Sequence, residues 1–329
     1  MVNKRAFGQT GAVVGEVGLG CWQLGADWGT VSKETAFLIL SAAVENGVDF
    51  WDTADVYGAG RSETLIGQFW KEHQAKVFVA TKLGRGEMYP GGYTRAAVRR
   101  ATESSLRRLR VEALDLTQLH CIPIEVLRQG EVFDWLRELK QEGKIRNFGA
   151  SVESMDEGLV CLAQEGLASL QIIFNIFRQK PIDVLFPPAQ AKGVAIIVRL
   201  PLASGLLSGK FTTETRFEQT DHRNYNRDGQ AFNVGETFAG LPFSKGIELA
   251  DGLKPLVPEG VTMAQMALRW ILDHEAVSVI IPGASRPEQV RSNASVSLPE
   301  VVPPLGESLH ARLRAYYEQN VRGWIRGPY

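Results

Sequence analysis

Short apolar runs alternate with amphipathic segments along most of the chain. The runs are unbroken rather than alternating with polar residues, which is typical of strands buried on both faces, as in a parallel sheet. Each run is followed by a segment with helical spacing of apolar residues, such as 62–73 or 94–109. The pattern predicts strands at 17–20, 48–51, 77–81, 114–119, 145–150, 170–174, 195–198 and 277–281.

Eight strand–helix units in a chain of this length predict an α/β fold, a (β/α)₈ TIM barrel. An open doubly wound sheet is the alternative. Residues 5–20 contain a β-hairpin signal around Gly8 to Gly11, and 307–319 predicts a C-terminal helix. No linker divides the chain, so we expect one domain over 1–329. The long polar interruption 211–238 follows the seventh strand, and loops of that length are usually functional or mobile. The other predicted helices are 32–47, 125–143, 155–165, one ending near 192, 261–273 and 287–294.

Composition narrows the function classes. The net charge of the 329 residues is −1 and no block of like charge occurs, so neither a nucleic acid nor a membrane is an expected partner. The first residues, MVNKRAFGQTG, lack the apolar centre of a signal peptide. Three cysteines form no metal-binding spacing, and no metal is expected. Their odd number suits a reducing cytoplasm, where we expect the protein.

Ionisable residues end three successive predicted strands: Asp52, Lys82 and His120, with Tyr57 in the turn after the first of them. In a barrel these strand ends lie side by side on the face where active sites form. A carboxylate at the end of a buried strand needs a cationic partner, because an unpaired buried charge is costly. Each residue alone is more often structural: an aspartate caps a helix or turn, a lysine forms an ion pair, and a histidine lies satisfied in the core. Their coincidence favours a shared site.

This group suits proton transfer to a carbonyl oxygen. A phenol has an unperturbed pKa of about 10, and an adjacent ammonium should lower the pKa of Tyr57. Asp52 would hold Lys82 beside Tyr57, and His120 would orient the carbonyl or share the proton. Because no side chain is a reductant, the arrangement implies a bound hydride carrier.

Candidate phosphate-binding segments follow the last two strands. PLASGLLSGK (201–210) offers small residues and a lysine, and IPGASR (281–286) opens a helix whose N-terminus favours anions. Gln289 and Asn293 share a helical face. Both side chains can hydrogen-bond a purine; the alternative is that their amides only cap the helix face. No GxGxxG motif follows an early strand, and the P-loop pattern fails at Ser204 and Phe211.

The motifs VGLGCWQLG, VDFWDTADVYG, VATKLG, LDLTQLH, NFGAS, VRLPLASGLLSGK and IIPGASRPEQVRSN occur in this order. With them the sequence resembles the aldo-keto reductase family along nearly its whole length. The resemblance implies a barrel that uses NADP(H) to interconvert carbonyls and alcohols. It implies a catalytic tetrad of Asp52, Tyr57, Lys82 and His120, with Tyr57 as the acid. It also implies cofactor contacts at Gly20, Cys21, Trp22, Asp52, Ser151, Gln171, Arg199, Pro201, Leu202, Gly205, Ser208, Lys210, Arg216, Gly283, Ser285, Arg286, Gln289 and Asn293.

Within that set, Gln171 and Ser151 would bind the carboxamide, and Lys210, helped by Arg216 or Arg286, the 2′-phosphate. Two positions depart from the family pattern. Val152 replaces a common asparagine, and Arg199 stands where many members stack a tyrosine on the nicotinamide. We hypothesise that Arg199 tunes cofactor affinity or preference.

Substrate contacts are expected from loops on the same face: 22–29, 84–93 and 211–238. The expected substrate residues are Trp22, Tyr57, His120 and Tyr89, within an apolar wall that also draws on Trp28, Met88, Tyr93 and Phe217. An active reductase is favoured. The alternatives are a cofactor-binding redox sensor, as in the related potassium-channel β subunits, and a dehydrogenase of sugars or inositols working toward oxidation. The chain could act as a monomer or a homo-oligomer.

Overall fold

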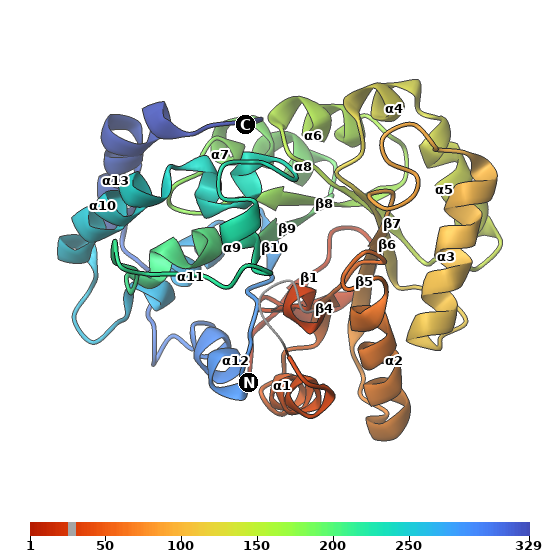
Figure 1. Cartoon of the computed structure of the whole chain (residues 1–329), viewed down its shortest axis with the longest axis horizontal. Helices are drawn as coiled ribbons and strands as arrows, with labels where there is room; N and C mark the ends of the chain where they lie inside the picture. The colour runs from red at the N-terminus through yellow and green to blue at the C-terminus, as the bar shows by residue number, and fades with distance from the viewer. Residues whose placement is uncertain (26–30) are drawn as a thin grey trace.

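The computed structural model describes residues 1–25 and 31–329. Strands β3 to β10 form one sheet of eight parallel strands, in which each strand pairs with the next in chain order (Figure 1). Parallel bridges Val17–Ile280 and Gly20–Gly283 join the first barrel strand to the last, so the sheet closes. The barrel prediction is confirmed and the doubly wound alternative is wrong. The strands are β3 (Leu19–Gly20), β4 (Phe50–Asp52), β5 (Phe78–Leu83), β6 (Leu116–His120), β7 (Phe148–Ser151), β8 (Leu167–Ile173), β9 (Ala195–Arg199) and β10 (Val277–Ile280).

Helices surround the barrel (Figure 1). Among the described residues, none is long and apolar enough to cross a membrane. The α-helices are α1 (Lys33–Glu45), α2 (Arg61–His73), α3 (Arg95–Leu109), α4 (Ile124–Gln129), α5 (Glu131–Gln141), α6 (Met155–Leu162), α7 (Pro181–Val184), α8 (Phe186–Ala191), α9 (His222–Tyr225), α10 (Phe243–Leu253), α11 (Met263–Leu272), α12 (Pro287–Ser295) and α13 (Glu307–Tyr316).

Two helix predictions need correction. The helix expected over 125–143 is broken into α4 and α5 at Gly130, whose φ of 84° does not fit a helix. The helix α10 was not predicted, although Ile247, Leu249, Ala250 and Leu253 form a buried apolar face. Its sequence signal is diluted by glycines at 246 and 252, which lower helix propensity.

The barrel interior is apolar at one end and polar at the other. A hairpin of β1 (Lys4–Ala6) and β2 (Val13–Gly15) closes the apolar end. Phe7 of this hairpin lies 5.4 and 5.2 Å, centroid to centroid, from the rings of Phe50 and Phe78. Side chains two apart on a strand share a face. Because Phe50, Ala80, Leu116 and Ile197 belong to this interior cluster, the residues two positions further on also point inward. Those residues are Asp52, Lys82, Gln118 and Arg199.

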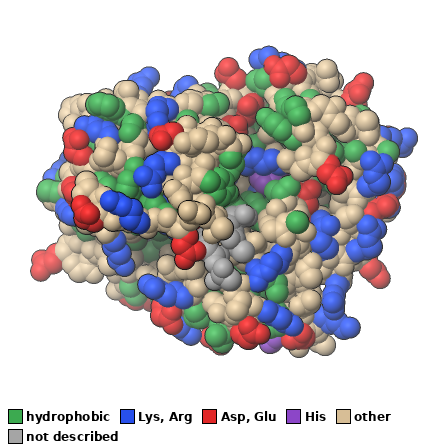
Figure 2. All heavy atoms as spheres, in the orientation of Figure 1, with side chains coloured by type: hydrophobic (Ala, Val, Ile, Leu, Met, Phe, Trp, Pro, Cys, Tyr) green, Lys and Arg blue, Asp and Glu red, His purple; other side chains and the backbone are tan. Residues whose placement is uncertain are grey.

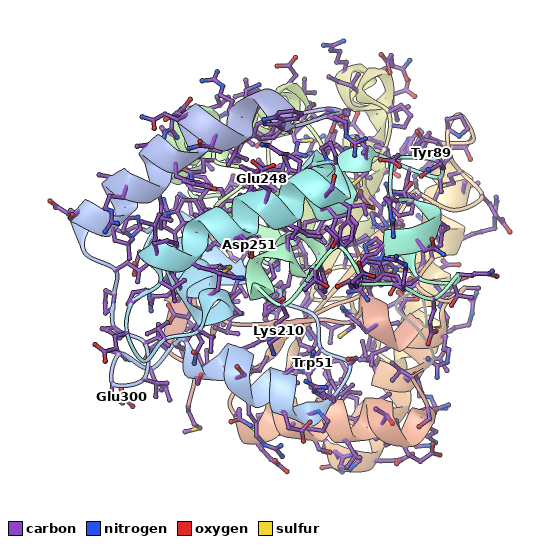
Figure 3. All side chains as sticks on the ribbon, turned by 60° about the vertical axis from the view of Figure 1, so that its left-hand side comes forward. Trp51, Tyr89, Lys210, Glu248, Asp251 and Glu300 are labelled. Carbon is purple, nitrogen blue, oxygen red and sulfur yellow. The ribbon has the colours of Figure 1, made fainter. Side chains whose placement is uncertain are left out.

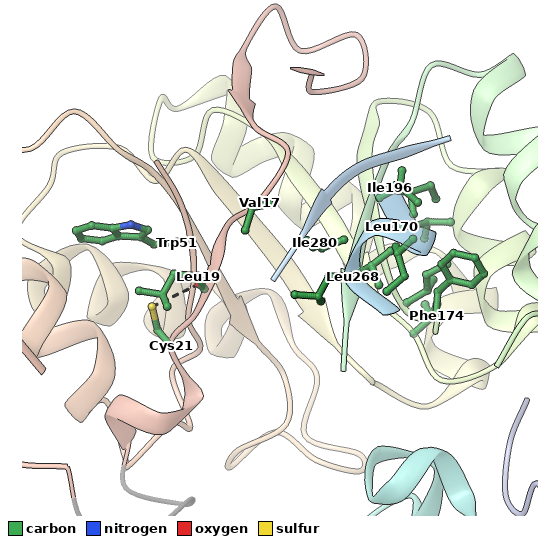
Figure 4. Close-up of a cluster of buried hydrophobic side chains, with 14 of the residues drawn as sticks. Val17, Leu19, Cys21, Trp51, Leu170, Phe174, Ile196, Leu268 and Ile280 are labelled. Carbon is green, nitrogen blue, oxygen red and sulfur yellow. Dashed lines mark hydrogen bonds between the residues drawn. The ribbon is translucent and has the colours of Figure 1, made fainter. Parts of the chain in front are cut away.

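A second, larger core lies between the strands and the helices. Figure 4 shows part of it, with Leu19, Cys21 and Trp51 on one side of the barrel and Leu170, Phe174 and Ile196 on the other. Trp51, fully buried here, alternates with the inward-facing Phe50 and Asp52. Burial on both faces explains why the strands read as continuous apolar runs.

A first prediction concerns the contact between α2 and α3. A Cβ atom at Gly67 would lie 2.3 Å from the backbone oxygen of Arg108. Alanine favours a helix over glycine by about 1 kcal/mol, yet we expect Gly67→Ala to lower the free energy of unfolding by about 1–3 kcal/mol through overpacking. Urea unfolding measures it. Gly323→Ala, where nothing lies within 4 Å, is the matched control and should be nearly neutral. A stabilised Gly67→Ala protein would contradict the close contact.

Candidate active site

Lys82 is the cationic partner of Asp52. Its ammonium donates hydrogen bonds to the Asp52 carboxylate at 2.5 Å, the Thr53 carbonyl at 2.8 Å and the Tyr57 hydroxyl at 3.0 Å. The Lys82 side chain has no exposed surface and that of Asp52 is 3% exposed. The register of the strands sets this contact, because Asp52 pairs with Ala80 and Lys82 pairs with Gln118 in the sheet. A buried ammonium with all three of its donors used is fully satisfied.

Two amides hold the other carboxylate oxygen of Asp52. Gln118 donates to it at 3.2 Å and Gln171 at 2.8 Å. Gln171 also donates to the side-chain oxygen of Gln118 at 3.3 Å. The amide that the sequence assigned to a cofactor carboxamide is therefore part of the network that fixes Asp52, while Gln171 still lines the cavity.

The pKa of Tyr57 is raised, opposite to the sequence expectation. Burial raises the pKa most; Lys82 lowers it, but Asp52 raises it again. The pKa of Lys82 is also raised, because the attraction of Asp52 and Tyr57 outweighs the effect of burial. Tyr57 is therefore protonated and Lys82 charged at neutral pH, which is the state that a proton donor needs.

His120 is neutral in this setting. Burial holds its pKa well below the ordinary value, and the positive charges of Arg85 and Lys82 push the pKa further down. Its ring packs edge-on against the Tyr57 ring with centroids 5.8 Å apart. Nδ1 of His120 has no hydrogen-bond partner within the described part of the chain. A neutral imidazole beside the phenol can hydrogen-bond a carbonyl oxygen or carry a proton.

These groups lie at one end of a cavity of about 380 Å³ on the carboxyl-end face of the barrel. In the space-filling view the same face is hollowed near its middle, with a histidine and basic side chains set into the hollow (Figure 2). Most of the residues expected to bind cofactor or substrate line the cavity. These are Gly20, Cys21, Trp22, Asp52, Tyr57, His120, Gln171, Arg199, Pro201, Leu202, Gly205, Ser208, Lys210, Gly283, Ser285, Arg286 and Gln289.

Four expected residues lie away from the cavity lining. Ser151 is buried with its hydroxyl 3.7 Å from the Cys121 sulfur. Asn293 donates to the Gly283 carbonyl at 3.5 Å, so it supports the lining from behind. Arg216 bonds the carbonyls of its own turn. Tyr89 is 52% exposed, on a loop apart from Lys210 (Figure 3).

Among the described residues of the expected apolar wall, Trp22 lines the cavity and the others do not. Its ring stacks on Tyr57 with centroids 5.8 Å apart and lines the cavity. Phe217 instead packs among Phe211, Phe238 and Phe243, and Met88 is buried. Tyr93 donates its hydroxyl to the Gly84 carbonyl. Trp28 lies outside the described residues.

The sequence analysis missed an ionic cluster that lines the cavity near His120. Arg85, after β5, donates to the two carboxylate oxygens of Glu236 at 3.0 and 2.9 Å. Arg199 reaches the same carboxylate at 3.3 Å, and all three residues line the cavity. Glu236 lies in the polar interruption, about 150 residues from Arg85 in sequence. No local motif signals such a contact.

The other end of the cavity suits a phosphate-bearing ligand. Lys210 and Arg286 line it with positive charge, and Arg223 lines it as well but is paired with Asp221 at 2.5 Å. The N-terminus of α12 follows Arg286 and favours anions. At Gly205, φ is 99°, and a Cβ there would lie 2.7 Å from Phe211, so a bare backbone faces the ligand space.

Comparison with known proteins identifies the family of this chain. The model of the aldo/keto reductase family matches residues 16–305. The chain belongs to the aldo-keto reductase family. It is 29% identical over 304 residues to aldo-keto reductase YhdN of Bacillus subtilis, across 89% of this chain and 88% of that protein.

Solved aldo-keto reductase structures share the fold. The holo form of AKR11C1 from Bacillus halodurans superposes with a TM-score of 0.77 at 26% identity, covering 99% of this chain and 98% of that one. An aldo-keto reductase from Klebsiella pneumoniae in complex with NADPH gives 0.69 at 25% identity and 96% coverage of each. This reductase family consists of oxidoreductases, so the chain is an oxidoreductase by family.

Stability of this aldo-keto reductase should depend on the buried pair. We expect Lys82→Met to lower the free energy of unfolding by about 3–5 kcal/mol, because it leaves the Asp52 charge buried without its cation. The double variant Lys82→Met/Asp52→Asn removes that charge and keeps an oxygen for the Gln118 and Gln171 amides. Urea unfolding at pH 7 should show the double variant recovering part of the loss. A double variant no more stable than Lys82→Met would contradict the unpaired-charge explanation.

Asp55 gives a pH-dependent prediction. Burial, and then the charge of Glu63, raise the pKa of Asp55 from 3.8 to about 7, and its Oδ1 has no partner among the described residues. The folded state therefore holds this proton more tightly than the unfolded state. The stability that protonation of Asp55 contributes to the folded state is fully present below pH 3.8 and is lost as the pH rises through about 7.

Asp55→Asn should remove this dependence. The free energy of unfolding of the variant minus that of wild type should increase from pH 4 to pH 8, by an amount on the order of a few kcal/mol. Urea unfolding at both pH values measures the gain. Asp251→Asn, which changes a half-exposed carboxylate paired with Lys254, is the control and should show no comparable trend. Parallel pH profiles for wild type and Asp55→Asn would contradict a raised pKa.

Proposed function

We propose that this aldo-keto reductase interconverts a carbonyl and an alcohol with NADP(H), and that Tyr57 is the proton donor in the reducing direction. The observation that carries the proposal is the chain of contacts from Asp52 through Lys82 to the Tyr57 hydroxyl at the cavity surface. Lys82 holds the hydroxyl in place from the buried side. The phenol proton is thereby left for a ligand in the cavity.

His120 supports the same chemistry. It lines the cavity next to Tyr57 and is neutral, so its ring can hydrogen-bond the carbonyl oxygen without adding a charge. When proton transfer from Tyr57 begins, the Lys82 ammonium stabilises the developing phenolate. NADPH, when bound, supplies the hydride. In the oxidising direction the same groups return the proton to Tyr57, so the geometry serves both directions.

The cofactor assignment rests on the cavity and on one relative. The Klebsiella pneumoniae enzyme was solved with NADPH. In this chain Lys210 and Arg286 line the cavity and are proposed to bind the 2′-phosphate. Arg216 is an unsuitable helper, because its guanidinium is occupied by its own turn and it does not line the cavity. The bare backbone at Gly205 and Gly283 suits a close approach of the pyrophosphate.

The substrate is proposed to be a small carbonyl compound or the matching alcohol. Trp22 forms an apolar face beside the Tyr57 hydroxyl, and the Arg85–Glu236 pair forms a polar one. NADPH consumption with a panel of aldehydes, ketones and sugars tests the class. Tight NADPH binding without turnover on any of them would favour a cofactor-binding sensor instead.

The catalytic role of Tyr57 gives a sharp prediction. Tyr57→Phe keeps the ring and removes the proton, so turnover should fall roughly 10²–10⁴-fold while NADPH affinity stays within about twofold. Steady-state kinetics and fluorescence titration measure the two quantities. The control is Tyr93→Phe, which removes a hydroxyl bonded to the Gly84 carbonyl outside the cavity lining. Its turnover should stay near wild type. Retained turnover in Tyr57→Phe would remove Tyr57 from its role.

A further inference from the structure

Glu236 brings a negative charge from the long segment after β9 to the catalytic end of the cavity. It ends the short helix η3 (Val234–Glu236), and its side chain is 4% exposed. Both of its oxygens accept hydrogen bonds from Arg85, and one of them lies 3.3 Å from the Arg199 guanidinium. One carboxylate thus faces two guanidinium groups.

Glu153 is the second carboxyl group of this cluster. It lies 3.2 Å from Arg85, and its carboxyl oxygen lies within 4.8 Å of a Glu236 oxygen. Burial and the charge of Glu236 raise the pKa of Glu153, so ionisation of both carboxyl groups together is disfavoured. Burial opposes ionisation of Glu236 as well, but Arg85 and Arg199 outweigh it and hold the pKa of Glu236 below its usual range. Glu236 is therefore the carboxyl group of this cluster in which the ionised form is favoured.

The backbone around Glu236 is held independently of its carboxylate. The Ser204 hydroxyl donates to the Glu236 carbonyl at 3.2 Å and accepts from the Phe238 amide at 3.1 Å. Further along, Arg326 donates to the Gly240 carbonyl at 2.9 Å. These bonds fix the segment from both sides. A change confined to the carboxylate should leave the loop in place.

The cluster lies at the end of the cavity where hydride transfer has to occur. Arg199, Gln171 and His120 line this end together with Tyr57. Proton and hydride must reach the same carbonyl group, so the redox-active ring of the cofactor has to approach the Tyr57 hydroxyl. That ring carries a positive charge when oxidised and none when reduced, and only the oxidised form therefore responds strongly to nearby charge.

We propose that Glu236, acting through Arg85 and Arg199, sets the relative affinity of the site for oxidised and reduced NADP. The proposal rests on the cofactor assignment made above. Glu236 offsets one of the two guanidinium charges and so permits binding of the cationic ring. Without that carboxylate the oxidised form is repelled, whereas the reduced form is little affected.

The test is the ratio of two dissociation constants, measured by fluorescence titration with NADP⁺ and with NADPH at pH 7. Glu236→Gln keeps an oxygen for Arg85 and removes the charge. The ratio of the NADP⁺ constant to the NADPH constant should rise on the order of tenfold. An unchanged ratio would overturn the proposal, and so would equal weakening of both forms, since that is the result of a purely structural role.

Two further variants separate charge from packing. Glu153→Gln changes the neighbouring carboxyl group, whose pKa is raised, so its ratio should shift less than that of Glu236→Gln. Arg199→Gln removes a positive charge, and its ratio should fall below wild type. This opposite shift keeps the proposal testable if Glu236→Gln does not fold; an Arg199→Gln ratio equal to wild type would overturn it.

The outcomes distinguish this proposal from the cofactor assignment. A wild-type protein that binds neither NADP⁺ nor NADPH would overturn the assignment and this proposal with it. A wild-type protein that binds both, with variants whose ratios do not shift, would overturn this proposal alone.

Discussion

The ion pair between Lys82 and Asp52 is the interaction on which the site depends. An isolated charge in this position would be strongly unfavourable, and the pair is tolerated because the ammonium and both carboxylate oxygens have hydrogen-bond partners. Lys82 uses its donors on Asp52, Thr53 and Tyr57, and Asp52 accepts further bonds from Gln118 and Gln171. Four barrel strands, β4, β5, β6 and β8, therefore meet at one charge pair.

This network defines what Tyr57 can do. The hydroxyl lies between a fully buried ammonium and the cavity, and its pKa is raised by burial despite that ammonium. In the proposed reaction this proton passes to the carbonyl oxygen of the substrate and leaves a Tyr57 phenolate, which the Lys82 ammonium stabilises.

A second ionic network depends on loops. Arg85, Glu236 and Glu153 come from three connections that follow different strands, and they meet beside His120. Barrels carry their functional variety in such connections while the strands supply a fixed frame. In this protein the frame holds Asp52, Lys82 and His120, the residues proposed for proton transfer, and the long segment after β9 brings the charge of Glu236 into the same cavity.

Sequence alone determined the barrel and which strand-end residues point into it. Unbroken apolar runs require two buried faces, and a two-residue repeat places Asp52, Lys82 and His120 inward once the strands are parallel. The family motifs in 281–289 likewise gave residues that line the cavity.

The sequence did not determine which of several plausible side chains reach the cavity. Tyr89 and Phe217 have the composition of a substrate wall, yet one is exposed and the other packs among phenylalanines. The use of the Gln171 amide by Asp52, the raised pKa of Tyr57 and the contact of Glu236 with Arg85 were decided by tertiary structure. Each depends on burial or on contacts between residues far apart in the chain, and neither leaves a local signal in the sequence.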